Sequence, residues 1–113
     1  VLDFHQNENV LPHIKKYDLI KGDATKTIYE YLDKNKHTMI SLAYFDMQLY
    51  TPTKKCLEAI KPYLVKGAII AMDEINNDEF PGETVAFREV FGLGNYEICK
   101  SKYLPDRSYM IYR

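Results

Sequence analysis

The stretch Met39–Tyr50, with the sequence MISLAYFDMQLY, decides the fold that we expect for this chain. It begins with an apolar run rich in residues that favour β-strands, and the acid Asp46 follows that run. An apolar run without polar alternation predicts a strand buried on both faces, as in a parallel sheet. A second run, Gly67–Asp73 (GAIIAMD), has the same design and is followed by Glu74. The segment between them, Thr51–Leu64, has the apolar spacing of a helix, so the three together predict a strand–helix–strand unit.

The helix of this unit carries its own start signals. Thr51 is expected to cap it, and Pro52 suits the first turn, where a missing backbone N–H costs nothing. Cys56 falls on the apolar stripe and is expected to be a small core residue. With only one other cysteine in the chain, neither a disulfide framework nor a zinc site is indicated.

The rest of the chain adds elements on both sides of this unit. Before it we expect a short helix, a short strand and a longer helix, at Val10–Lys15, Tyr17–Ile20 and Ala24–Lys34. After it we expect a helix and a terminal antiparallel strand pair, at Thr84–Phe91, Tyr96–Lys100 and Ser108–Tyr112. This order predicts the α/β class, with a mostly parallel sheet and a C-terminal antiparallel strand pair.

Length and composition limit the classes of function. The chain has 113 residues, enough for one domain or part of one, and it begins with Val1 rather than Met, which suggests a piece of a longer protein. Its 15 basic and 16 acidic residues are mixed along the chain and leave a net charge of −1. This balance argues against nucleic acid and membrane surfaces as partners. Without a membrane-spanning run or a signal peptide, a cytoplasmic location is expected.

The acids that end the two apolar runs are the candidate chemical centre. Adjacent parallel strands lie about 5 Å apart, so Asp46 and Asp73 would reach the same edge of the sheet, where Glu74 follows. Three carboxylates at that distance repel one another unless a cation lies between them, and Mg²⁺ prefers such oxygen ligands. A second interpretation stays open, because acids after strands also solvate loops or cap helices.

Several short motifs follow one another along the chain: Gly22-Asp23-Ala24, Leu42–Tyr50 with Thr51-Pro52-Thr53, Lys66-Gly67, Asp73-Glu74 and Pro81-Gly82-Glu83-Thr84. Their order resembles that of class I S-adenosylmethionine-dependent methyltransferases. The likeness runs from Asp18 to Arg113 and is strongest to the metal-dependent sugar O-methyltransferases of the macrocin O-methyltransferase type. The chain therefore resembles the C-terminal part of a Rossmann-like methyltransferase domain, with residues 1–113 as a single unit.

This resemblance implies roles for particular residues. Asp23 would bind the adenine amino group of S-adenosylmethionine, the amide of Ala24 would contact the ring, and Tyr44 would line either the cofactor or the core. Asp46 would act in catalysis and, with Asp73 and Glu74, would hold Mg²⁺. The acceptor would be a small molecule with a hydroxyl group, such as a sugar or sugar nucleotide.

The chain departs from the family in two ways. Where the sugar enzymes have a second Asp that can serve as general base, this chain has Gln48, which cannot take a proton at neutral pH. The first strands, the glycine-rich loop and the acid that binds the ribose are not found in the sequence. We therefore expect the chain alone to be inactive. Its unpaired strand edges can pair with another copy of the chain, so a homo-oligomer stays an open alternative.

Two other classes of function remain as alternatives. One is a non-catalytic α/β binding or assembly module, which the residue Gln48 makes conceivable. The other is a Mg²⁺-binding, receiver-like domain with an acid pocket, which ranks lower. Receiver-type domains place a pair of acids near the first strand and a lysine after a late one, whereas here the acids follow the middle strands.

Overall fold

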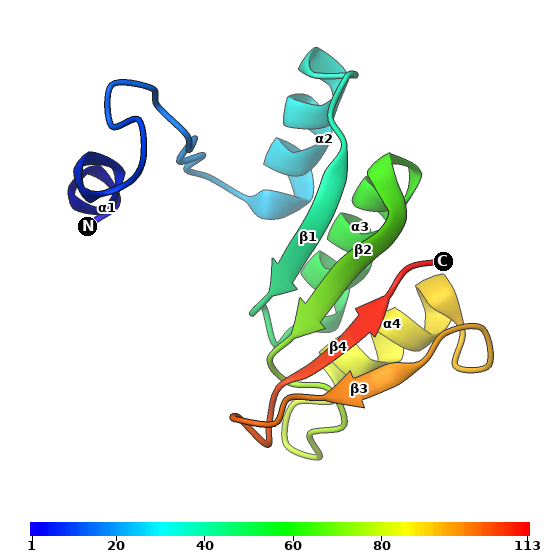
Figure 1. The fold of residues 1–113 in the computed structure, drawn as a ribbon. Coiled ribbons are helices and arrows are strands. Elements are labelled where there is room, and N and C mark those ends of the chain that lie inside the picture. The colour runs from blue at the N-terminus through cyan, green and yellow to red at the C-terminus, as the bar shows by residue number, and fades with distance from the viewer.

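The computed structural model describes all 113 residues and shows a small α/β fold (Figure 1). The helices are α1 (Leu2–Glu8), α2 (Ala24–Lys34), α3 (Tyr50–Ile60) and α4 (Gly82–Phe91), with a 3₁₀ turn at Lys61–Tyr63. The strands are β1 (Ile40–Phe45), β2 (Leu64–Met72), β3 (Ile98–Lys100) and β4 (Ser108–Ile111). None of the helices combines the length and hydrophobicity of a membrane span.

The strand–helix–strand unit is present as the sequence predicts. Strand β1 lies parallel to β2, and α3 connects them. The register runs from Leu42 beside Ile69 to Phe45 beside Met72, so the two strands end side by side. This matched ending places the residues that follow β1 and β2 at one edge of the sheet.

The sheet as a whole is mixed and not mostly parallel. Its strand order is β1-β2-β4-β3, and β4 is antiparallel to both β2 and β3. The C-terminal antiparallel pair is therefore confirmed. The strand expected at Tyr17–Ile20 does not form: the segment has no partner strand, and Leu19 is 78% exposed. Without a neighbouring strand, an apolar segment gains neither ladder hydrogen bonds nor burial.

The hydrophobic core lies between the sheet and helices α2, α3 and α4, all of which cover the same face (Figure 1). Its most buried large side chains come from four elements: Leu57 of α3, Ile70 of β2, Phe87 of α4 and Met110 of β4. Cys56 of α3 is also buried, which confirms its expected place in the core.

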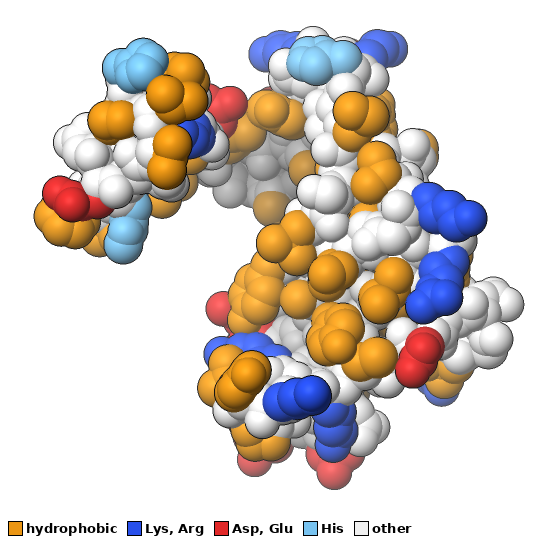
Figure 2. Space-filling model, in the orientation of Figure 1, with side chains coloured by type: hydrophobic (Ala, Val, Ile, Leu, Met, Phe, Trp, Pro, Cys, Tyr) orange, Lys and Arg blue, Asp and Glu red, His pale blue; other side chains and the backbone are white.

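The opposite face of the sheet is bare. Leu42 and Tyr44 of β1 and Ile69 of β2 are 64%, 55% and 39% exposed, and Tyr109 of β4 lies beside them. Figure 2 shows apolar side chains gathered over this part of the molecule. The expectation that β1 is buried on both faces is therefore wrong, because no element of the chain covers this side of the parallel pair.

Two local predictions fail near helix ends. The helix expected at Val10–Lys15 is a turn, where Pro12 supplies no backbone donor, and helix α1 forms earlier in the chain instead. Helix α1 has no buried residue and lies apart from the sheet (Figure 1). Helix α3 begins one residue before Thr51, so the residue at its N-cap is Leu49, with no side-chain cap.

Candidate functional site

The acids Asp46 and Asp73 are neighbours at the carboxyl edge of the parallel pair. Each is the first residue after its strand, and the backbone N–H of Asp73 donates to the carbonyl of Phe45 across 3.1 Å. Asp46 is exposed, and its carboxylate makes no hydrogen bond or ion pair within the chain. Asp73 is mostly buried, with 12% of its side chain exposed. The strand register therefore brings the two acids to one edge but gives them different environments.

The carboxylate of Asp73 already has two partners. The guanidinium Nε of Arg107 forms an ion pair with Asp73 Oδ1, and the hydroxyl of Tyr44 donates to the same oxygen at 3.0 Å. Tyr44 lies on the bare face of the sheet, so the core is excluded as its place, and its place beside the cofactor stays a prediction. Contacts of this kind fix the orientation of the Asp73 carboxylate.

Arg107 was not identified from the sequence, although one signal was available. Strand β4 is antiparallel to β2, and Ser108 lies opposite Met72. The residue before Ser108 therefore lies beside the residue after Met72, which is Asp73. A basic residue directly before a strand that returns antiparallel to an acid-bearing strand would have indicated this pair.

Glu83 belongs to a motif that the sequence analysis named, but its role as a buried carboxyl group was not predicted. Its side chain is fully buried at the start of α4, where Oε2 accepts the backbone N–H of Glu74 at 3.1 Å and Oε1 has no partner. Burial raises the pKa of Glu83 to about 7, and the negative charges of Glu74, Asp73 and Asp46 add to the rise, while the hydrogen bond from Glu74 opposes it. A carboxyl group with a raised pKa thus lies beneath the acidic edge of the sheet, which is formed by Asp46, Asp73 and Glu74.

Gly82, from the same motif, lies where α4 meets the loop after β1. A Cβ at this position would lie 2.5 Å from the backbone nitrogen of Tyr50 and 2.7 Å from the carbonyl oxygen of Gln48. The backbone at the start of α4 therefore packs directly on the backbone of the loop that follows β1. Gln48 itself is exposed and has a left-handed φ of 60°.

The side chains of Asp46, Asp73 and Glu74 do not form a metal centre in this arrangement. Asp73 is held by Arg107 and Tyr44, and the Oε2 atom of Glu74 accepts from the side-chain amide of Asn77 at 2.6 Å. No three side chains of the His, Cys, Asp or Glu type converge on one point anywhere in the chain. A divalent cation does not fit these residues as they are placed.

Asp23 caps helix α2, as its position suggested. Its Oδ1 accepts from the backbone N–H and the hydroxyl of Thr25 at 3.0 and 2.7 Å, whereas Oδ2 makes no hydrogen bond within the chain. The carbonyl of the next residue, Ala24, accepts from the thiol of Cys56 at 3.7 Å. One carboxylate oxygen of Asp23 thus stays free for a ligand, and the adenine contact remains a prediction.

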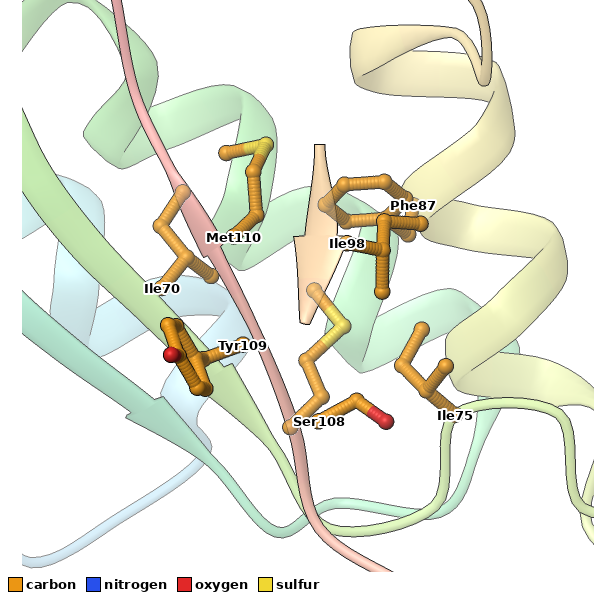
Figure 3. Close-up of a pocket in the computed structure, with 8 residues that line it drawn as sticks. Ile70, Ile75, Phe87, Ile98, Ser108, Tyr109 and Met110 are labelled. Carbon is orange, nitrogen blue, oxygen red and sulfur yellow. The ribbon is translucent and has the colours of Figure 1, made fainter. Parts of the chain in front are cut away.

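Two hollows in the molecule differ in kind. The first lies in the core under β4, among apolar side chains that include Ile70, Phe87 and Ile98 (Figure 3), and its volume of about 10 Å³ admits at most one water molecule. The second is an open groove of about 500 Å³ on the bare face, which includes Tyr44 and Arg107 in its lining. Of the two, only the groove has room for a ligand, and it adjoins the acidic edge.

Solved structures confirm the resemblance inferred from the sequence. Two crystal structures of CalS11, one of them described as an apo TDP-rhamnose 3'-O-methyltransferase of calicheamicin biosynthesis, superpose with a TM-score of 0.90 and 41% identity. The superposition covers 97% of this chain and 47% or 43% of the CalS11 chains, so this chain spans about half of their length. No protein-family model and no curated protein matches the chain. The chain is therefore similar to part of a sugar O-methyltransferase.

The contact at Gly82 predicts a loss of stability when a side chain is added there. Gly82→Ala should lower the free energy of unfolding by about 1–3 kcal/mol, because the new Cβ forces two backbone segments apart. Gly94→Ala is the matched control, since a Cβ at Gly94 meets no atom within 4 Å. Urea denaturation of both variants measures the difference, and equal stabilities would show that the two loops do not pack as described.

The buried carboxyl of Glu83 predicts a pH-dependent stability. Its pKa is about 7 in the folded state against an ordinary 4.5, so the folded protein binds this proton more tightly than the unfolded chain. The stability from this proton is complete below about pH 4.5 and is lost as the pH rises through 7. Glu83→Gln should therefore match the unsubstituted protein near pH 4.5 and exceed its unfolding free energy by about 1–3 kcal/mol at pH 8.

Urea denaturation at both pH values tests this prediction. Glu89→Gln serves as the control, because hydrogen bonds from Tyr50 and Lys54 lower the pKa of the Glu89 carboxyl and its removal should have the opposite sign. If the free energy of unfolding changes with pH in the same way in Glu83→Gln and in the unsubstituted protein, Glu83 is ionised in the fold.

Proposed function

We propose that this chain is the acceptor-side part of an S-adenosylmethionine-dependent O-methyltransferase that transfers a methyl group to a hydroxyl of a sugar or sugar nucleotide. The observation that carries the proposal is the 41% identity to CalS11 over 97% of this chain, at a TM-score of 0.90. An open groove beside the acidic edge supports it, because the groove gives an acceptor room next to Tyr44 and Arg107, the two residues that bind Asp73.

Asp46 is the residue that we assign to the acceptor. When bound, S-adenosylmethionine supplies an electrophilic methyl group whose bond to sulfur breaks as the acceptor oxygen attacks. The attacking hydroxyl must lose its proton, and the free carboxylate of Asp46 can receive it at the edge of the sheet. Gln48 cannot share this role, because an amide does not accept a proton at neutral pH. No step of this proposal passes through a metal ion, since the acids are not arranged to hold one.

The residues that would meet the cofactor lie on the other side of β1. Asp23 offers its unpaired Oδ2 to the adenine amino group, and the backbone amide of Ala24 would contact the ring. Each such hydrogen bond contributes only about 1 kcal/mol net, too little to bind a cofactor against the cost of association. We therefore propose that a part of the methyltransferase outside these residues supplies most of the affinity for S-adenosylmethionine.

A non-catalytic binding module remains the second candidate. The exposed Gln48, in a place where the related sugar enzymes carry an acid, favours it. Such a module would keep the fold and the groove but would not depend on the charge of Asp46. Substitution of this residue therefore separates the two candidates.

The test is methyl transfer by the full-length protein from isotopically labelled S-adenosylmethionine to a nucleotide-linked deoxysugar. Asp46→Asn should lower kcat by about 100-fold or more, because it removes a proton acceptor without changing the size of the side chain. Asp106→Asn, on the exposed loop between β3 and β4, is the control and should leave kcat unchanged. Transfer that is equally fast in both variants would remove Asp46 from the reaction, and no transfer by the unsubstituted protein to any hydroxyl acceptor would favour the binding module.

A further inference from the structure

The acidic edge contains four carboxyl groups and one cation. Asp46, Asp73, Glu74 and the buried Glu83 lie close enough for the first three to influence the charge state of the fourth. Among the ion pairs of the chain, the one between Arg107 and Asp73 is the only pair that involves any of these acids. The positive charge at this edge is therefore a guanidinium that the chain itself supplies.

The backbone holds Arg107 in place on both sides. Its N–H donates to the carbonyl of Leu104 at 3.0 Å, and its carbonyl accepts the N–H of Ser101 at 2.9 Å. The next residue, Ser108, begins β4 opposite Met72. Because the turn and the strand fix its Cα beside the end of β2, Arg107 is positioned to meet Asp73 without ordering a long mobile loop.

The contact itself uses the atoms that a metal ion would need. Arg107 Nε and the Tyr44 hydroxyl both bind Oδ1 of Asp73, on a side chain that is only 12% exposed. Mg²⁺ prefers charged carboxylate oxygens and needs near-octahedral geometry around itself. It could reach this oxygen only after the guanidinium had moved away.

We infer that Arg107 is the resident counter-ion of the acidic edge, bound to Asp73 in the position that a divalent cation would otherwise take. Arg107 is a positioning residue in this role: it orients Asp73 and keeps divalent cations weakly bound. The inference rests on the contacts of Asp73 and does not depend on the methyl-transfer proposal, so either can fail alone.

The experiment measures Mn²⁺ binding to the protein by electron paramagnetic resonance, which counts the free ion. The unsubstituted protein should bind Mn²⁺ weakly, and Arg107→Gln should lower the Kd at least tenfold by freeing Asp73. Arg107→Lys keeps the positive charge at the edge and should stay weak. Lys102→Gln is the matched control, because it removes one positive charge from the same loop at an exposed position.

The double variant Arg107→Gln/Asp73→Asn assigns the new site. It should lose the gain in Mn²⁺ affinity, because the freed oxygen is no longer charged. Equal Mn²⁺ affinity of Arg107→Gln and Lys102→Gln would overturn the inference, since the effect would then be one of net charge. Tight Mn²⁺ binding by the unsubstituted protein would also overturn it, because the cation would then displace Arg107 unaided.

A second measurement needs no change at Arg107 and so remains valid if that variant unfolds. In the unsubstituted protein, the side-chain Nε–H signal of Arg107 should be protected from exchange with water in nuclear magnetic resonance spectra. The protection should fall at least tenfold in Asp73→Asn and persist in Asp106→Asn. An unprotected signal in the unsubstituted protein would contradict the ion pair.

Discussion

The parallel pairing of β1 with β2 is the interaction on which the rest of this structure depends. Because Phe45 lies beside Met72, both strands end at the same level and deliver Asp46 and Asp73 to one edge. Strand β4 then uses the other side of β2 in the antiparallel sense, and so its first residues return to that edge with Arg107. Asp46, Asp73 and Arg107 are thus placed by β2 and by the two strands that pair with it, whereas Glu83 comes from α4.

The same pairing explains why helices cover one face of the sheet while the other face is bare. Helices α2, α3 and α4 bury the side chains of β1, β2 and β4 that point toward them, while Leu42, Tyr44 and Ile69 point the other way and remain exposed. Parallel strands are normally covered on both faces. A sheet covered on one face agrees with a chain that spans 47% of a similar, longer protein. The groove and the acidic edge both lie where the bare face meets the carboxyl ends of the strands.

The elements that the sequence predicted well are those with strong local signals. Helix α2 has the expected bounds, because Asp23 caps it and its apolar residues share one face. The strand–helix–strand unit follows from two long apolar runs. The segment Tyr17–Ile20 has similar composition but no strand, because a strand also needs a neighbour and local sequence does not reveal one.

The candidate site was likewise predictable from the sequence only in part. That Asp46 and Asp73 are adjacent could be predicted, since the ends of parallel strands meet at one edge. The partners of these acids could not, because Arg107 and Glu83 lie on other elements and meet the acids only through tertiary packing. The expected metal centre depended on treating the carboxylates as unpaired. In the fold, Asp73 is paired with a guanidinium and Glu74 accepts a hydrogen bond from Asn77, so only Asp46 has no partner.

The most direct test of this account is a chimera in which this chain replaces the matching part of CalS11. The account holds that this chain supplies an acceptor side whose strand ends are equivalent to those of the sugar methyltransferase. We expect the chimera to fold, to bind S-adenosylmethionine and to methylate TDP-rhamnose or a related nucleotide sugar. A chimera that folds and binds the cofactor, but transfers no methyl group to any sugar hydroxyl, would contradict it.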